Sequence, residues 1–243
     1  MTYEVKDGKL IVEMDAPHPQ VLPFYPTYDI TQKSALAVED YRKVDNCCGH
    51  TQRSWLTYYC LKALVESGGG IGVDLGSGGV AMPGCISLDI VGNGEAPHYG
   101  GIMRGVHIKA DAADLRMLQS DAFSIVIGNH IVEHVPCTTL TPRATVEQRI
   151  RCQCTGDEVG YVIRNHWLRI LRPGGMLCLV TPDDTPARAV GSSAFFYDPD
   201  HKHAWTAAEF HDHVLQKLMD VAEIVEFDTF QNNFSFNVCL RKR

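Results

Sequence analysis

The chain has 243 residues, of which 45% are hydrophobic and 21% are charged, and its formal net charge is -7. This length fits one α/β domain with extra elements, and the acidic balance argues against a protein that binds mainly by neutralising nucleic-acid phosphates. No apolar run approaches the roughly 20 residues of a membrane-spanning helix and no signal peptide is apparent, so we expect a cytoplasmic protein.

The first 67 residues differ in pattern from the rest of the chain. Residues 9–14 alternate between apolar and polar side chains, and four prolines between positions 17 and 26 then exclude a regular helix. From about Thr31 to Glu66 apolar residues recur at helical spacing, and three glycines at 68–70 end that stretch. We therefore expect an N-terminal arm and helical lid over residues 1–67, followed by the main domain over residues 68–243.

The main domain alternates short apolar runs with helical or irregular crossings. Its pattern predicts strands at 71–75, 85–90, 106–110, 123–128 and 176–181, and helical stretches at 114–118, 145–151 and 159–171. Such alternation is typical of a parallel sheet with helices on its faces. Pro173-Gly174-Gly175 is read as a tight turn into the fifth strand.

The pattern at the end of the chain predicts a helix followed by two adjacent strands. A capped helix is expected from Thr206 to about Met219, because Glu209 follows the capping residue by three positions. Two strands come next, at 222–229 and 234–241, and the few residues between them allow only an antiparallel hairpin. The predicted fold class is therefore α/β, with a doubly wound, mostly parallel, seven-stranded sheet that ends in an antiparallel hairpin.

Polar residues follow the predicted strands where ligands of an open α/β sheet bind. Asp74 precedes the glycine turn of the first strand, where it would repel a pyrophosphate but attract an ammonium or hydroxyl group. Asp89 ends the second strand and can accept hydrogen bonds from both ribose hydroxyls. Asp111 follows the third and either accepts from an adenine amino group or caps the next helix. These preferences favour S-adenosylmethionine, which carries an ammonium, a sulfonium and a ribose.

Five segments in this order carry a family resemblance. They read Asp-Leu-Gly-Ser-Gly, Ser-Leu-Asp-Ile, Ala-Asp-Ala-Ala-Asp-Leu, Phe-Ser-Ile-Val-Ile-Gly-Asn-His-Ile-Val-Glu-His-Val and Trp-Leu-Arg-Ile-Leu-Arg-Pro-Gly-Gly-Met-Leu. Over about residues 72–182 the chain resembles the class I S-adenosylmethionine-dependent methyltransferases, in particular a type 11-like branch. The resemblance implies a cofactor site formed by Asp74, Gly76, Ser77, Gly78, Asp89, Ile90, Asp111, Ala112 and Asn129.

The resemblance also implies an acceptor and a reaction. A shortened Pro-Gly loop, residues 80–84, stands where most members have a full helix, and it is similar to a branch that we associate with sugar or envelope modification. We therefore expect methyl transfer to a small-molecule or glycan-like acceptor, with no nucleic-acid partner. His130 follows the fourth strand and is the candidate base if the acceptor is a poorly acidic hydroxyl. The sequence does not indicate an oligomeric state.

Other interpretations of the same residues stay open. Gly76-x-Gly78-x-x-Ala81 also fits the fingerprint of a nicotinamide-dependent oxidoreductase, and a non-catalytic nucleoside-binding protein could keep the same fold. His130-Ile131-Val132-Glu133-His134 matches the inverted zinc-peptidase signature. Because this segment directly follows a buried strand, we expect no metal there and a structural role for Glu133 and His134. No metal is expected either at Cys47-Cys48 or at Cys152-Gln153-Cys154, which lack zinc-site spacing.

Overall fold

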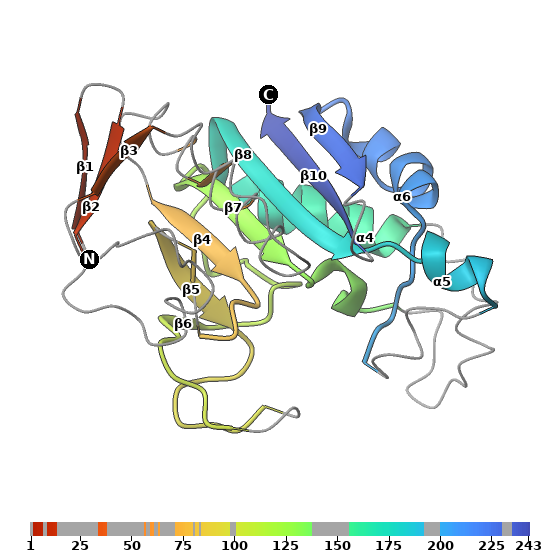
Figure 1. The fold of residues 1–243 in the computed structure, drawn as a ribbon, viewed down its shortest axis with the longest axis horizontal. Coiled ribbons are helices and arrows are strands. Elements are labelled where there is room, and N and C mark those ends of the chain that lie inside the picture. Colours follow the sequence, from red (N-terminus) through yellow and green to blue (C-terminus); the bar gives the residue numbers. More distant parts are fainter. Residues whose placement is uncertain are drawn as a thin grey trace.

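The computed structural model describes the chain in several stretches (Figure 1). They comprise the backbone of three N-terminal strands, four helical positions between 56 and 63, residues 71–97 except 80 and 83, and residues 101–137, 156–191, 200–229 and 235–243. The predicted helix at 145–151 and the cysteine pairs at 47–48 and 152–154 lie outside the described residues. In the part of the chain that is described, no helix is long and apolar enough to cross a membrane.

The N-terminal strands form a small sheet of their own. The strands β1 (Thr2–Lys6), β2 (Lys9–Glu13) and β3 (Ser34–Ala37) pair antiparallel in that order. β3 lies inside the stretch that was expected to be helical from Thr31, so that expectation was wrong for this segment, where pairing with β2 outweighs the local helical pattern. The division into a lid over 1–67 and a main domain over 68–243 stays a prediction.

The main sheet has seven strands in the order β6-β5-β4-β7-β8-β10-β9. Their bounds are β4 Gly72–Leu75, β5 Cys85–Asp89, β6 Ile108–Lys109, β7 Phe123–Asn129, β8 Leu171–Pro182, β9 Ala222–Thr229 and β10 Ser235–Lys242. The five strands from β6 to β8 run parallel, whereas β10 pairs antiparallel with both β8 and β9. This arrangement confirms the predicted fold class.

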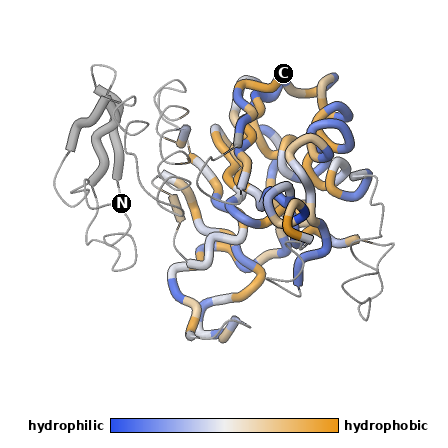
Figure 2. The backbone as a smooth tube through the Cα atoms, turned by 45° about the vertical axis from the view of Figure 1, so that its right-hand side comes forward, coloured by the Kyte–Doolittle hydropathy of each residue, from blue (hydrophilic) through white to orange (hydrophobic). Residues whose placement is uncertain are grey.

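Helices pack on the sheet through one apolar face. The helix α4 (Asp157–Val162) continues without a break into the π-helical segment η3 (Ile163–Leu168), which confirms the helix expected near 159–171. Trp167 in η3 is fully buried. Figure 2 shows hydrophilic and hydrophobic residues alternating along the helices, as expected of elements with one face on a core.

The C-terminal helix begins where its capping residues predict. Thr206 Oγ1 accepts a hydrogen bond from the Glu209 backbone N–H at 3.1 Å, and the Thr206 N–H donates to Glu209 Oε2 at 2.9 Å. This capping box precedes α6 (Ala207–His213), and the 3-10 helix η5 (Leu215–Leu218) follows it. A further short helix, α5 (Thr185–Ala189), follows β8.

Two local predictions were wrong. Residues 114–118 form turns instead of a helix, because Asp111 Oδ1 accepts from the Ala113 N–H at 2.8 Å and Asp114 Oδ1 from the Arg116 N–H at 3.3 Å. Such side-chain bonds compete with helix formation. The fifth strand was expected to begin at 176, but β8 begins at Leu171. The expected turn at 173–175, where Gly174 has a φ of 77°, lies inside this strand, at the register shift between the pairs Phe123–Leu171 and Ile125–Met176.

Candidate functional site

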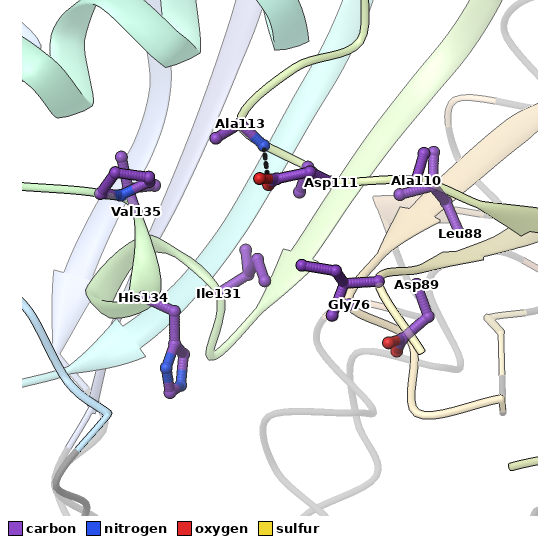
Figure 3. A pocket seen from close by; sticks show the side chains of 12 residues that line it. Gly76, Leu88, Asp89, Ala110, Asp111, Ala113, Ile131, His134 and Val135 are labelled. Carbon is purple, nitrogen blue, oxygen red and sulfur yellow. Dashed lines mark hydrogen bonds between the residues drawn. The ribbon is translucent and has the colours of Figure 1, made fainter. Parts of the chain in front are cut away.

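A pocket of about 290 Å³ lies at the carboxyl ends of β4, β5 and β6, as expected for a parallel sheet (Figure 3). Its other wall comes from Ile131 and from the 3-10 helix η2 (Val132–His134) after β7. The volume is at the lower end of ordinary small-molecule sites, which begin at about 300 Å³. Five of the predicted cofactor residues line this pocket: Gly76, Asp89, Ile90, Asp111 and Ala112.

Asp89 is the most firmly held carboxylate of the pocket. The residue is 7% exposed, its Oδ2 accepts from the Gly78 N–H at 2.9 Å, and its Oδ1 accepts from the Val91 N–H at 3.0 Å. These two backbone donors fix the orientation of the carboxylate and leave further lone pairs on both oxygens. Asp89 can therefore accept hydrogen bonds from a diol while it keeps both hydrogen bonds from the backbone.

Gly76 brings the turn after β4 close to the opposite wall. Its φ is 62°, a left-handed conformation, and its N–H donates to the Leu88 carbonyl at 2.9 Å. A Cβ atom at this position would lie 2.7 Å from Cδ1 of Ile131. A larger residue here would both strain the backbone and push into the pocket wall.

Asp111 and Ala112 form the edge of the pocket beyond β6. Asp111 is exposed, and its carboxylate accepts a hydrogen bond from the Ala113 N–H, two residues further along the chain. This contact places the carboxylate beside the cavity (Figure 3). The Ala112 carbonyl accepts a hydrogen bond from Nε1 of the buried Trp167 at 2.8 Å. The pocket edge is thereby tied to the helix that crosses from β7 to β8.

Three predicted residues shape the glycine loop and do not line this pocket. Asp74 is 3% exposed, and its Oδ2 accepts from the Met82 N–H at 2.9 Å. Ser77 Oγ forms a hydrogen bond with Ser87 Oγ and accepts from the Gly79 N–H, while Gly78 donates to Asp89. The described residues of the loop 76–84 contain no helix, in agreement with the shortened connection. That Asp74, Ser77 and Gly78 contact a cofactor stays a prediction.

Asn129 is the last residue of β7, and His130 follows it in an unusual backbone conformation. His130 has a φ of 54°, which is uncommon for a residue other than glycine. Its Nδ1 lies 3.2 Å from Oε1 of Glu133, and its Nε2 lies 3.4 Å from Oγ of Ser235. The Asn129 Oδ1 is buried and accepts no hydrogen bond from the described residues. Neither residue lines the pocket, so their predicted roles remain predictions.

The carboxylate next to His130 is buried but stays ionised. Burial alone would raise the pKa of Glu133. The facing His130 imidazole and a hydrogen bond to the backbone of Glu133 itself lower the pKa by more than burial raises it, so the net pKa is below its usual value of 4.5. Glu133 is therefore negatively charged near neutral pH. A buried charge of this kind needs partners.

The structure also assembles a group that the sequence did not suggest. Ligand atoms of Glu133, His134 and His201 lie within 4.8 Å of one another. The zinc-peptidase pattern would instead pair His130 with His134 on an α-helix, but η2 is a three-residue 3-10 helix, which removes that spacing. His201 is far away in the chain, and no local signal connects it to the other two.

No described cysteine lines the pocket. Burial is the largest cause that raises the pKa values of Cys85 and Cys178 well above 9.0, so both remain protonated thiols.

Comparison of the sequence with protein-family models and with curated proteins finds no match. Solved structures with a similar fold include the N-methyltransferase NodS from Bradyrhizobium japonicum WM9 in complex with S-adenosyl-L-homocysteine, with 15% identity, coverage of 92% of this chain and 97% of that chain, and a TM-score of 0.48. An S-adenosylmethionine-dependent methyltransferase from Mesorhizobium loti has 13% identity, coverage of 71% and 90%, and a TM-score of 0.46. Identities and TM-scores this low bear on neither the cofactor nor the acceptor of this chain.

Proposed function

We propose that this chain binds S-adenosylmethionine in the pocket at the ends of β4, β5 and β6, and transfers its methyl group to a small-molecule or glycan-like acceptor. The observation that carries the proposal is Asp89, a backbone-anchored and nearly buried carboxylate on the pocket wall. Gly76 and Asp111 lie on the same pocket. A nucleoside bound there would meet an acceptor for each ribose hydroxyl and a second carboxylate at the far edge.

The proposed cofactor contacts follow the order of the strands. Asp89 would accept from the ribose hydroxyls, with Ile90 against the base, and Asp111 with Ala112 would contact the adenine. The loop with Asp74, Gly76, Ser77 and Gly78 would hold the amino-acid end, and Asn129 would lie near the sulfonium. When bound, the cofactor supplies an electrophilic methyl group, and the protein contributes mainly alignment and exclusion of water.

His130 is the proposed base for a hydroxyl acceptor. Glu133 Oε1 lies beside its Nδ1, which favours a proton on that nitrogen and leaves Nε2 as the acceptor. Ser235 Oγ is close to Nε2, so a hydroxyl already lies where a proton would be taken up. An acceptor amine that is already neutral would not need this base.

The proposal is tested by calorimetric titration with S-adenosylmethionine, S-adenosylhomocysteine and NADH. We expect both sulfur nucleosides to bind and NADH not to bind. Binding of NADH alone would indicate an oxidoreductase, and binding of the nucleosides without turnover across a panel of labelled-methyl acceptors would indicate a binding protein. Absence of nucleoside binding would refute the proposed site.

A matched pair of variants tests the role of Asp89. Asp89→Asn keeps the side-chain shape but removes the charge and one acceptor oxygen, and we expect S-adenosylhomocysteine to bind roughly 10- to 100-fold more weakly. Asp114→Asn is the control, because Asp114 is part of the same region, pairs with Arg116 and does not line the pocket. Unchanged affinity in a folded Asp89→Asn variant would remove Asp89 from the ribose site.

A further inference from the structure

Three side chains with metal-ligand chemistry converge beside the pocket. Glu133 and His134 come from η2, and His201 comes from the segment that precedes α6. Each offers one ligand atom, and these atoms lie within 4.8 Å of one another. His134 also lines the pocket, across from Asp89 and Gly76 (Figure 3), so the three residues lie next to the candidate site and extend beyond it.

The two oxygens of the Glu133 carboxylate have different surroundings. The residue is 1% exposed, and Thr181 Oγ1 donates to its Oε2 at 3.2 Å. The other oxygen, Oε1, is buried and accepts no hydrogen bond from the described residues. It faces His130 Nδ1 at 3.2 Å and His201 Nε2 at 4.0 Å. His130 compensates part of this buried negative charge, and a cation bound to Oε1 would compensate more of it.

Backbone contacts hold His201 in place. The Glu133 carbonyl accepts from the Lys202 N–H at 2.7 Å and from the His203 N–H at 3.1 Å. The ring centroids of His134 and His201 are 4.9 Å apart with an interplanar angle of 76°. The segment after His201 is therefore fastened to η2, and the approach of the two imidazoles does not depend on the side chains alone.

We propose that Glu133, His134 and His201 bind one divalent transition-metal ion, with zinc as the best match. Two imidazole nitrogens and one carboxylate oxygen form a mixed donor set that suits zinc and related ions, whereas magnesium and calcium prefer oxygen ligands throughout. Ligand atoms about 2.0–2.1 Å from a tetrahedral ion are roughly 3.4 Å apart. The ligand atoms of the three residues lie within 4.8 Å of one another, with 4.0 Å between His201 Nε2 and Glu133 Oε1, so they would approach by side-chain rotation when the ion binds.

Three protein ligands leave a fourth coordination position open. Open positions are typical of metal sites that bind water or a substrate, not of closed structural sites. The shared residue His134 would place the ion at the edge of the pocket. A carboxylate oxygen has two lone pairs, so Oε1 can face His130 and the ion together. This inference concerns the metal alone and does not rest on the proposed methyl transfer.

The test uses the full chain, freed of metal by a chelator and then titrated with ZnCl₂ or CoCl₂ in the absence of any nucleoside. We expect one equivalent of metal to bind, and the cobalt form to show the intense visible absorption of a four-coordinate site. His201→Ala and His134→Ala should each weaken zinc binding by at least about 10-fold, since even residues that only support ligands change affinity by about that factor.

The control is His211→Ala, which removes a histidine of α6 that pairs with Asp212 outside the cluster. It should bind zinc as the unmodified chain does. The proposal is overturned if zinc binds no more tightly to the unmodified chain than to the His134→Ala, His201→Ala double variant, or if His211→Ala causes an equal loss. Circular dichroism of each variant separates lost ligation from lost folding, and nucleoside titration of metal-free protein tests the proposed function separately.

Discussion

Two connections between neighbouring parallel strands of the sheet perform the same task in different ways. The connection from β7 to β8 includes a long helical run, α4 with η3, whereas the connection from β4 to β5 spans only residues 76–84. Both leave the same edge of the sheet, and both supply a wall of the pocket. The sheet can therefore place a short and a long crossover at a single site.

The two connections are stabilised by different interactions. The long one buries large apolar side chains such as Trp167 and Ile163. The short one buries one large apolar side chain, Met82, and adds polar contacts of its backbone: Asp74 Oδ2 accepts from the Met82 N–H, and the Gly76 N–H donates to the Leu88 carbonyl. We infer that the long crossover is sensitive to side-chain volume and the short one to backbone geometry.

The largest expected effect is on the long crossover. Trp167→Ala should lower the free energy of unfolding by about 3–5 kcal/mol, because the side chain is fully buried and its removal leaves a cavity. It should also loosen the pocket edge, since the hydrogen bond to the Ala112 carbonyl is lost. Trp167→Phe is the comparison variant, which keeps most of the apolar contact. Urea unfolding measures the stability of both variants. A loss below about 1 kcal/mol for Trp167→Ala would contradict the inference that the long crossover depends on side-chain volume.

A smaller effect is expected on the short crossover. Gly79 has a φ of 80°, and a Cβ there would lie 2.0 Å from the Arg104 carbonyl oxygen. Gly79→Ala should therefore destabilise the chain by about 3 kcal/mol, from the strained φ together with the backbone clash. Gly94→Ala separates the two causes, because Gly94 has a φ of 84° but no atom within 4 Å of the added Cβ. It should cost only about 1–2 kcal/mol, and equal losses in the two variants would rule out the clash.

The smallest effect concerns His166, a polar residue of the long crossover that is hydrogen-bonded to the Leu115 backbone. Burial in η3 lowers the pKa of His166 below its usual 6.5, and its Nδ1 accepts from the Leu115 N–H at 3.1 Å. The fold thus favours the neutral ring, whose contribution to stability is complete above the unfolded pKa of 6.5. That contribution is lost as the pH falls through the lower pKa of the folded state.

His166→Gln checks this assignment, because glutamine can accept the same hydrogen bond but does not titrate. Urea unfolding between pH 7.5 and pH 5 should show a smaller loss of stability for the variant than for the unmodified chain. An identical pH dependence in both proteins would mean that His166 does not sense the pH.

Most of the sheet follows from local sequence. The apolar runs of β4, β7 and β8 and the capping pair Thr206 and Glu209 act over a few residues, so they predict their elements well. Residues 114–118 did not form a helix because two aspartate side chains bond to nearby backbone groups instead. β3 depends on pairing with β2, which a local pattern does not contain.

The same distinction applies to the candidate site. Asp89, Gly76 and Asp111 reach the pocket because the ends of parallel strands meet at one edge, a rule that can be applied to a sequence. His201 could not be assigned in this way. Its position beside Glu133 depends on backbone hydrogen bonds between distant segments, which follow from the folded structure alone.

The placement of β10 between β8 and β9 also determines how stability can be observed. Its backbone groups are bonded on both sides, and Phe236, Val238 and Leu240 are fully buried. Amide protons in such an interior strand exchange with deuterium mainly when the whole domain opens. A few β10 amides followed by mass spectrometry or NMR would therefore report on damage to either crossover.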